Sequence, residues 1–374
     1  MKPDNAAIDP RFAERERQPG LDLLRALAIV VVVFYHAGLF GFALPNRVHR
    51  FGWVGVDLFF VLSGYLIGGQ LLGQIARTGA IPLGRFFVRR ALRIMPAYLV
   101  VLAIYAALPG WREFPEMTPL WKFVVSLQNI GMRGGTAFSH AWSLAIEDQF
   151  YLLLPFILIL LARRPRAAIT VVCLMIVAGF ALRWSLAQAN LTPDGVSFRA
   201  FQKLIYYPTW TRLDPLVLGV SCAALERFRP HVWRRIAKFA SWIWLPGIAL
   251  VALALYLGED QLTVNACVWQ FPLIALGMSA LLIAAVGPTM PLAHVRIPGA
   301  AFLASIAYSV YLSHKLVIHG AIALCEKLNL AQTSVPALLL VQLMIYTGGV
   351  ILFLAVERPF LLLRRRVARR SPAR

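Results

Sequence analysis

The stretch 26–46, ALAIVVVVFYHAGLFGFALPN, contains no Asp, Glu, Lys or Arg. A helix that crosses the hydrocarbon core of a bilayer needs about 20 mostly apolar residues, and this run is long enough. Further runs without these four residue types follow along the chain, at 58–76, 94–111, 149–162, 167–182, 239–258, 261–295, 297–314 and 328–356. The pattern predicts a membrane protein with many helical spans.

The composition of the 374-residue chain agrees with this interpretation. It is 59% hydrophobic and 14% charged, with a mean hydropathy of +0.69. Soluble proteins carry about 25% charged residues, so a soluble globular enzyme is excluded. The net charge of +20 would suggest nucleic-acid binding in a soluble protein. In a membrane protein it indicates basic cytoplasmic loops, and we expect a lipid bilayer and no nucleic acid as partner.

We predict an all-α fold of about ten transmembrane helices in one bundle. The sixth of these spans is interrupted by Arg212 and Asp214, and the segment 119–130 is too short to cross, so we expect it to be re-entrant or interfacial. The four cysteines form no CxxC pair, and we expect neither a metal site nor a disulfide framework. The predicted spans are 21–42, 53–73, 94–110, 142–162, 167–187, 204–225, 239–258, 265–287, 299–321 and 336–358.

The basic residues predict the orientation. With the amino terminus in the cytoplasm, 26 of the 37 Lys and Arg residues fall on the cytoplasmic side, as the positive-inside rule requires. Both termini are therefore expected in the cytoplasm. We expect a cytoplasmic segment 1–20, a transmembrane domain 21–360 and a basic cytoplasmic tail 361–374.

Ionisable side chains inside spans are costly if they face lipid, so each is expected to face a cavity or a partner. His36 is one such residue, and it follows Arg25 by eleven positions, about 16 Å along a helix. With Arg25 at the cytoplasmic edge, His36 would lie in the outer half of the membrane. It would act either in a structural hydrogen bond to a neighbouring helix or in proton transfer, because an imidazole titrates near neutrality.

Carboxylates form a second group of candidates. Asp57 opens the second span at a comparable depth, where a helix N-terminus stabilises its charge. Glu147 and Asp148 point about 100° apart on a helix, so we expect only one to face the bundle interior. Asp214 stands two positions after Arg212, and residues so spaced do not face each other, so each is expected to neutralise another buried charge.

Glycines and arginines near the second and third spans complete the pattern. Gly52, Gly55 and Gly64 would let another helix approach closely. Arg90 and Arg93 share one helix face, and two guanidinium groups there suit bidentate phosphate binding. The alternative is that these arginines only anchor the topology.

Taken together and in order, seven stretches resemble the acyltransferase-3 family of integral membrane acyltransferases, which modify bacterial surface polysaccharides. The resemblance covers about 20–360 of the chain. The stretches are Leu21-Asp22 through Arg25 to His36, GVDLFFVLSG from Gly55, RRALRIMP from Arg89, WSLAIEDQFY from Trp142, Arg212-Leu213-Asp214, Tyr308-Ser309 with YLSH from Tyr311, and VERPF from Val356.

The resemblance implies ten membrane helices in the bacterial inner membrane and an acyl-CoA donor, usually acetyl-CoA, with no permanently bound cofactor. It implies an acceptor hydroxyl on a saccharide or lipid-linked glycan. Carried over by motif, His36 resembles the essential histidine of the family, Arg90 and Arg93 its arginine pair, and Glu147 its motif glutamate. Asp148 departs from the pattern, since many members have a second glutamate there.

The resulting hypothesis makes His36 the general base, with Glu147, or alternatively Asp57, as its orienting partner. Arg90, Arg93 and the adjacent Arg89 would bind the phosphates of CoA. Two other mechanistic possibilities remain: a covalent acyl-enzyme intermediate on Ser143 or Tyr308, and stabilisation of the oxyanion by Arg212. Supporting residues would be Arg25, Arg212, Asp214, Ser143, Tyr308 and His314, the last alternatively an interfacial residue.

A proton-coupled transporter is the main alternative to an acyltransferase, because buried ionisable groups also mark proton relays. A non-catalytic membrane scaffold explains these buried charges less well.

Overall fold

The computed structural model describes residues 18–42, 48–161 and 163–369. Its only strands are the two-residue β1 (Leu191–Thr192) and β2 (Gly195–Val196), so within these residues the predicted all-α class is confirmed. Eight helical segments of the described chain are long and apolar enough to cross a membrane: Pro19–Leu39 with α1, Arg50–Thr78 with α2, Ser139–Leu161 with α5, Pro165–Ala189 (α6), Ala240–Leu257 (α10), Val264–Val286 (α11), Ala300–Lys327 (α12) and Val335–Arg364 with α13.

Two of the ten predicted spans differ from this set. α3 (Leu83–Ala107) begins eleven residues before the predicted span 94–110, directly after Pro82. The arginines of 85–93 therefore lie on the helix itself and not in a loop. The predicted sixth span over 204–225, which we expected to be interrupted at Arg212 and Asp214, is not a single helix in the structure.

The segment of the predicted sixth span is broken into short pieces. α7 (Phe198–Ala200) leads into the π-helix η5 (Phe201–Tyr206), the 3-10 turn η6 (Thr209–Thr211) and α8 (Asp214–Phe228). Pro208 directly precedes η6 and Pro215 stands in the first turn of α8; each restricts the residue before it and lacks an N–H for the helical ladder. The break places Arg212 on irregular backbone between η6 and α8 and Asp214 at the first residue of α8.

Shorter elements connect the long helices. α4 lies in the segment 119–130 and has only five residues, which confirms that this segment does not cross as a helix. Residues 1–17 and 370–374, which hold parts of the two predicted terminal segments and their basic residues, lie outside the described chain. The connecting elements are the 3-10 helices η2 (Val48–Val54), η3 (Pro109–Trp111), η4 (Ser139–Ala141) and η7 (Pro291–Ala293), α4 (Leu120–Val124), α9 (Pro230–Ala237), the π-helix η8 (Phe353–Glu357) and α14 (Arg358–Arg369).

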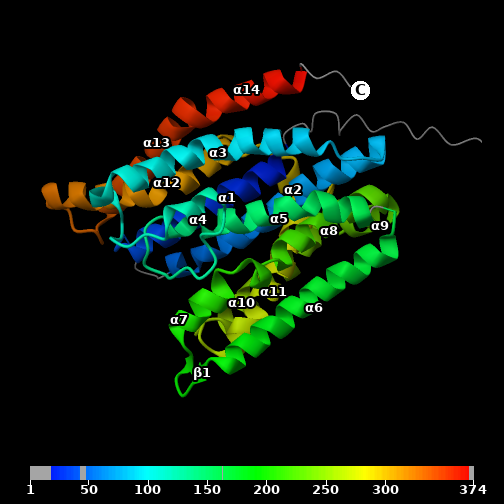
Figure 1. Ribbon diagram of the computed structural model, residues 1–374, viewed down its shortest axis with the longest axis horizontal. Helices are drawn as coiled ribbons and strands as arrows, with labels where there is room; N and C mark the ends of the chain where they lie inside the picture. Colours follow the sequence, from blue (N-terminus) through cyan, green and yellow to red (C-terminus); the bar gives the residue numbers. More distant parts are fainter. Residues whose placement is uncertain (1–17, 43–47, 162, 370–374) are drawn as a thin grey trace, which may run out of the picture.

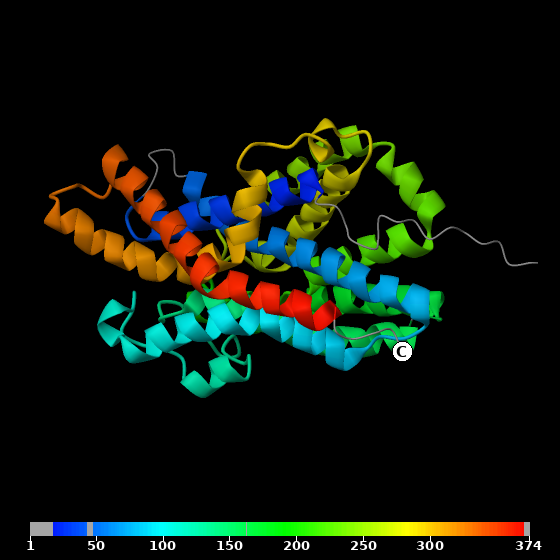
Figure 2. The same cartoon turned by 90° about the horizontal axis from the view of Figure 1, so that it is seen from above.

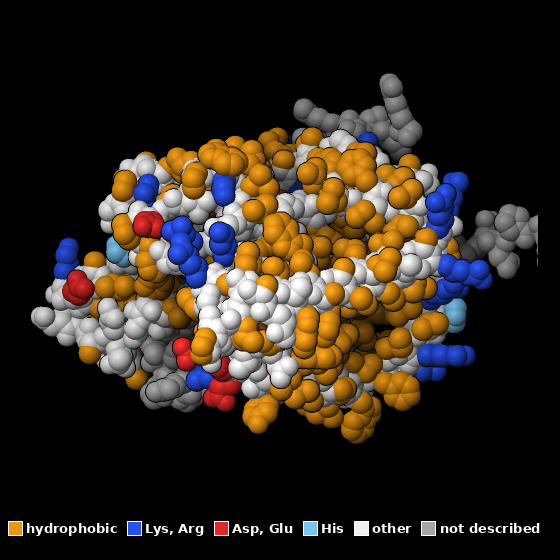
Figure 3. Space-filling model, turned by 60° about the horizontal axis from the view of Figure 1, so that its bottom comes forward, with side chains coloured by type: hydrophobic (Ala, Val, Ile, Leu, Met, Phe, Trp, Pro, Cys, Tyr) orange, Lys and Arg blue, Asp and Glu red, His pale blue; other side chains and the backbone are white. Residues whose placement is uncertain are grey.

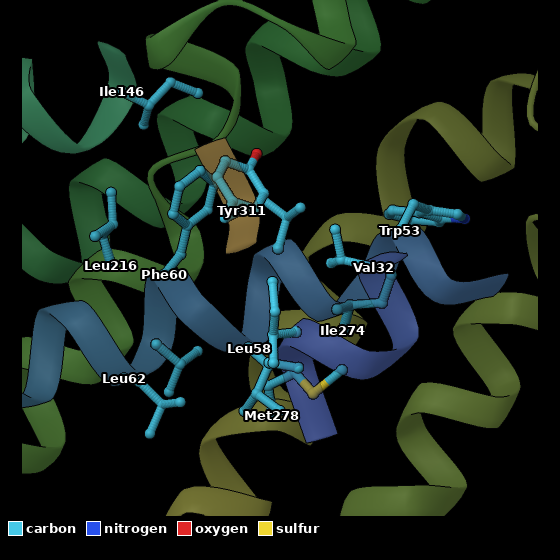
Figure 4. Close-up of a cluster of buried hydrophobic side chains, with 14 of the residues drawn as sticks. Val32, Trp53, Leu58, Phe60, Leu62, Ile146, Leu216, Ile274, Met278 and Tyr311 are labelled. Atoms are coloured by element: carbon cyan, nitrogen blue, oxygen red, sulfur yellow. The ribbon is translucent and has the colours of Figure 1, made fainter. Parts of the chain in front are cut away.

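The helices form a bundle with α1 and α2 in its interior (Figure 1). α1 packs against α12, α2 against α8, and α10 pairs with α11. Figure 2 shows α14 running beside α3 on one side of the bundle, and the two helices are in contact. In the core, side chains from different helices meet, among them Val32, Leu58, Ile146, Leu216 and Ile274 (Figure 4).

Close backbone approaches occur at the predicted glycines. A Cβ atom on Gly64 would collide with the carbonyl oxygen of Leu216 in α8. Likewise, Gly52 and Gly55 lie against backbone carbonyls of α1. The prediction that these glycines admit a neighbouring helix is confirmed.

The outer surface of the bundle is largely apolar. Figure 3 shows hydrophobic side chains over the middle of the molecule and Lys and Arg side chains toward both ends, with the visible Asp and Glu side chains toward the left end only. α6 and α10 contribute few buried residues and expose large apolar side chains such as Leu174, Val177, Trp242 and Tyr256. Such a surface suits contact with lipid.

Candidate active site

Arg212 and Asp57 form a fully buried ion pair between η6 and the first turn of α2. The Nη2 of Arg212 donates to both carboxylate oxygens of Asp57, at 2.9 and 3.0 Å, and neither side chain is exposed. Aromatic rings surround the guanidinium, with that of Phe271 centred 4.1 Å from its Cζ and that of Tyr206 4.9 Å. These rings keep the guanidinium of Arg212 away from solvent.

Asp214 pairs with a different arginine. Arg183 of α6 donates through Nη1 to Asp214 at 2.6 Å and to the carbonyl of Thr211 at 2.8 Å, and its side chain is fully buried. The prediction that Arg212 and Asp214 neutralise other buried charges, and not each other, is confirmed. Arg183 was not identified from the sequence, although it lies within the predicted span 167–187.

Glu147 faces α2 and α3 from the second turn of α5. Ser63 donates to its Oε1 at 3.1 Å and the Nη2 of Arg90 donates to its Oε2 at 3.3 Å. Arg90 also lies over the ring of Tyr151, 3.5 Å from its centroid. Asp148 turns to another neighbour and accepts a hydrogen bond from Ser126 at 3.1 Å. The two adjacent carboxylates thus diverge, as their helical spacing predicts.

A cavity of about 140 Å³ lies beside this ion pair, and we call it the arginine cavity. Arg90 and Arg93 both line it, which confirms that they share a face of α3. Arg25 of α1 lines it as well, whereas Arg89 is exposed and is not part of its wall. The predicted grouping of Arg89 with Arg90 and Arg93 therefore does not hold geometrically. Other polar lining residues are Ser63, Ser143, Glu147, Ser305, Tyr308, Tyr311 and Glu357.

Three histidines from three helical segments lie together, and we call them the histidine cluster. They are His36 of α1, His140 of η4 and His314 of α12. The ring centroids of His36 and His314 are 4.7 Å apart, as are those of His140 and His314, while His36 and His140 are 6.4 Å apart. His140 and His314 are buried and His36 is half-buried.

Backbone carbonyls determine which nitrogen of each neutral histidine ring carries the proton. The Nδ1 of His36 lies 3.0 Å from the carbonyl oxygen of Val32, and a carbonyl only accepts, so Nδ1 carries the proton. By the same reasoning, the Nδ1 of His314 carries a proton, because it lies 2.7 Å from the carbonyl oxygen of Tyr311. The Nε2 of His140 carries one as well, because it lies 3.1 Å from the carbonyl oxygen of Leu312. The other nitrogen of each neutral ring keeps a lone pair. Among the described contacts of His36, this carbonyl takes the orienting position that we expected Glu147 or Asp57 to occupy.

A lysine lies at the edge of the histidine cluster. The Nζ of Lys315 donates to the Oγ of Ser139 at 2.8 Å and lies 4.0 Å from Glu113. Phe138 directly precedes Ser139 in the chain. Its backbone has a left-handed φ of 56°, which is an uncommon conformation for a residue with a bulky side chain. Its backbone N–H donates to Glu113 at 3.1 Å, which holds this turn and so positions His140. Strained backbone of this kind concentrates at functional sites.

Ser143 and Tyr311 separate the arginine cavity from the histidine cluster. Both line the cavity, and their hydroxyl oxygens are 2.7 Å apart. Tyr311 donates to the carbonyl of His140 at 2.7 Å, so the hydroxyl of Ser143 donates to Tyr311. The ring of Tyr311 also lies 5.7 Å from that of His314. One short hydrogen-bonded step therefore joins the two parts of the site.

The structure divides the predicted site residues into two groups. Arg25, Arg90, Arg93, Ser143, Glu147 and Tyr308 surround the arginine cavity, with His36 and His314 just beyond it. Asp57, Arg212 and Asp214 belong to separate buried ion pairs. Sequence reasoning missed His140, Lys315 and Tyr311, although His140 lies two residues before Trp142, at which one of the seven stretches begins.

The site offers neutral imidazoles, hydroxyls and guanidinium groups. Within the part of the chain that the structure describes, no group of three His, Cys, Asp or Glu side chains is placed to hold a metal ion. The arrangement combines anion binding with proton transfer, which suits transfer of a group from a phosphate-bearing donor.

The fold and this site define a polytopic membrane protein with buried histidine and arginine side chains inside a helical bundle. Residues 18–356 match the family model described as an acyltransferase domain, and the chain belongs to this acyltransferase-3 family. The resemblance carried by the seven sequence stretches is confirmed, and with it the predicted enzyme class, an acyltransferase.

Related proteins agree with this assignment. The chain is 31% identical to the O-acetyltransferase OatA of Staphylococcus aureus strain NCTC 8325 / PS 47 over 261 residues, which is 65% of this chain and 41% of OatA. The OatA of strain COL gives the same values. The chain thus spans about two fifths of the length of the curated relatives it matches. No solved structure is significantly similar to the chain.

Proposed function

We propose that the protein is a membrane O-acyltransferase that moves an acetyl group from acetyl-CoA to a hydroxyl of a cell-surface or lipid-linked saccharide. The observation that carries this proposal is the contact between the arginine cavity and the histidine cluster at Ser143 and Tyr311. A site for a phosphate-bearing donor thereby opens next to a site for proton transfer.

The donor would bind in the arginine cavity. Guanidinium groups bind phosphate bidentately, and Arg25, Arg90 and Arg93 all line this cavity. Glu147 holds Arg90 in place, and it does so without a direct contact to His36 among the described interactions. The thioester of the donor would then lie toward Ser143 and Tyr311.

His36 would act as the general base. Its Nδ1 donates to Val32, so the lone pair on Nε2 is available to accept the hydroxyl proton of the acceptor. As that proton moves to Nε2, the hydroxyl oxygen forms a C–O bond to the thioester carbonyl carbon and the C–S bond breaks. The CoA thiolate leaves and takes the proton from His36, which restores the neutral imidazole. His314 supports the ring of His36 from α12.

We further propose that the protein crosses the bacterial inner membrane with both termini in the cytoplasm. The end of the bundle where α2 ends and α3 begins carries exposed arginines, among them Arg77, Arg85 and Arg89. The positive-inside rule supports a cytoplasmic location for this end, which is the side from which acetyl-CoA is supplied.

The test is transfer of label from radioactive acetyl-CoA to an envelope glycan by the purified protein in lipid nanodiscs. The glycan fraction is extracted from a host strain that lacks the gene, so that its hydroxyls are free. We expect labelled glycan and release of one CoA thiol for each acetyl group transferred. Unlabelled glycan with intact acetyl-CoA would overturn the proposal.

An assay of the same protein in sealed vesicles distinguishes the acyltransferase from the proton-coupled transporter. Accumulation of a solute coupled to a proton gradient, without any acylated product, would favour a proton-coupled transporter. Acylated glycan in the absence of any gradient would favour the acyltransferase.

A further inference from the structure

A second cavity, of about 360 Å³, lies at the opposite end of α1 from the arginine cavity. We call it the loop pocket, because three connections between helices form most of its wall: η2 after α1, the segment with Phe198 after α6, and the turn between α10 and α11. Its lining residues are Tyr35, Arg50, Phe51, Trp53, Phe198, Leu255, Gly258, Glu259, Asp260, Gln261, Leu262 and Gln270.

We propose that the loop pocket binds an uncharged sugar unit of the acceptor and presents its hydroxyl to the histidine cluster. This inference rests on the proposed function and names the place and chemistry of acceptor recognition.

Gln270 supplies the first argument. Its side chain is 1% exposed, it lines the pocket, and its Oε1 has no hydrogen-bond partner among the described residues. An acceptor atom buried without a partner is costly, so a ligand that donates a hydrogen bond would be favoured there. The amide of Gln270 fits over Gly258, where any Cβ atom would collide with it.

The remaining wall matches the surface of a sugar ring. Tyr35, Phe51, Trp53 and Phe198 offer aromatic rings, against which the C–H face of a sugar can pack. Carboxylate and amide oxygens nearby accept hydrogen bonds from hydroxyl groups. A pocket with apolar walls and a few polar groups of fixed direction is typical of small-molecule binding.

The charge of the loop pocket disfavours an anionic ligand. Glu259 and Asp260 bring two carboxylates, and Arg50 brings one guanidinium that lies 3.4 Å from Glu259. The phosphates of CoA would be repelled here and attracted at the arginine cavity. This difference assigns the two cavities to different substrates and favours a neutral acceptor unit.

The walls are held in place before any ligand arrives. Asp260 accepts a hydrogen bond from the backbone N–H of Leu262 at 3.0 Å, which closes a tight turn. The carbonyl of Leu262 accepts in turn from the N–H of Val196 at 2.7 Å, which ties this turn to β2. Trp53 is 3% exposed and its ring lies 6.2 Å from that of Phe271. Preorganised walls of this kind reduce the cost of binding.

α1 connects the loop pocket to the proposed chemistry. Tyr35 lines the pocket, and its ring centroid is 5.0 Å from that of His36. Arg25 lines the arginine cavity ten residues earlier on the same helix, about 15 Å away along its axis. His36 directly follows Tyr35, so the proposed base lies beside the acceptor site and about 16 Å along the helix axis from Arg25 at the donor site.

The experiment titrates the envelope glycan of the deletion strain at saturating radioactive acetyl-CoA, with the full chain in nanodiscs. The test variants are Gln270→Leu and Phe198→Ala. Phe198 is 58% exposed, so its removal leaves the core intact. Each variant should raise the half-saturating glycan concentration by about five- to tenfold, as loss of one hydrogen bond or one ring contact implies. The affinity for acetyl-CoA, measured separately, should not change.

Two control variants repeat the same substitutions elsewhere. Gln342→Leu removes a glutamine of α13 that lies in neither cavity, and Phe239→Ala removes a ring that is 63% exposed. Both should retain the half-saturating glycan concentration of the unmodified protein. If the two test variants also retain it while transfer proceeds, the loop pocket is not the acceptor site and the proposed function stands. If the unmodified protein transfers no acetyl group to glycan, the proposed function fails and this assignment fails with it.

Discussion

Arg212 reaches across the bundle to Asp57 and is bonded to both oxygens of its carboxylate, at 2.9 and 3.0 Å, with no exposure of either side chain. The pair joins irregular backbone in the broken sixth span to the first turn of α2. Three aromatic rings, of Phe271, Tyr206 and Trp142, enclose the guanidinium. The arrangement is a structural link between two segments, set apart from the arginine cavity.

Removal of one partner should therefore destabilise the protein more than removal of both. Arg212→Met leaves the carboxylate of Asp57 buried without a counter-charge, which costs about 3–5 kcal/mol. The double variant with Asp57→Asn leaves no charge and should recover part of this loss. Thermal unfolding in detergent, followed by size-exclusion chromatography, measures both. A single variant as stable as the unmodified protein, or a double variant less stable than the single one, would contradict this role.

Contact between α2 and α8 depends on Gly64. Gly64→Ala would force its Cβ into the carbonyl oxygen of Leu216, and overpacking of this kind costs about 1–3 kcal/mol. Gly73 lies on the same helix with nothing within 4 Å of its added Cβ, so Gly73→Ala is the matched control. We expect a lower melting temperature for the first variant and an equal or higher one for the second. Equal melting temperatures for both variants would show that α2 and α8 can move apart without a loss of stability, which would contradict this prediction.

Local patterns in the sequence were sufficient for part of this structure. Charge-free runs identified the long apolar helices, and helical spacing separated Glu147 from Asp148 and Arg212 from Asp214. The spacing could not name the partners, because Asp57 is 155 positions from Arg212 in the chain and only the fold brings them together. The sixth span was expected to be interrupted at Arg212 and Asp214, but composition alone does not show that the helix ends before Pro208 and starts again at Asp214.

The candidate site shows the same limit. His36 was identified from its position in an apolar run, and Arg90 and Arg93 from their shared helix face. His140 and His314 join His36 only through the packing of η4 and α12 against α1. The partner of His36 was also misjudged, since a backbone carbonyl of its own helix needs no residue signal in the sequence.

Replacement of His36 tests the proposed base. His36→Ala removes the nitrogen that would accept the hydroxyl proton, and turnover should fall by about 10²- to 10⁴-fold. Acetyl-CoA affinity should be unchanged, because His36 is not part of the wall of the arginine cavity. His319→Ala, on the same helix as His314 but outside the histidine cluster, serves as control and should keep full turnover. If His36→Ala, at an equal protein level, transferred acetyl groups at the rate of the unmodified protein, His36 would not be the general base.

The arginine cavity makes a distinct prediction for donor binding. Arg93→Gln and Arg90→Gln should each weaken acetyl-CoA binding by about 10- to 100-fold, the loss expected for a hydrogen bond to a charged group. Acetyl-pantetheine carries the thioester but not the nucleotide phosphates, so its binding should respond little to either substitution. Isothermal titration of both compounds against the protein in nanodiscs gives the comparison.

Exposed arginines of the same helix provide the control for that comparison. Arg85 and Arg89 are exposed and do not line the arginine cavity, so Arg85→Gln and Arg89→Gln should leave acetyl-CoA affinity close to that of the unmodified protein. Equal losses for all four variants would mean that the arginines act through general surface charge, and such losses should then disappear at high salt. Losses confined to Arg90 and Arg93 that persist at high salt would place the phosphates of CoA against this face of α3.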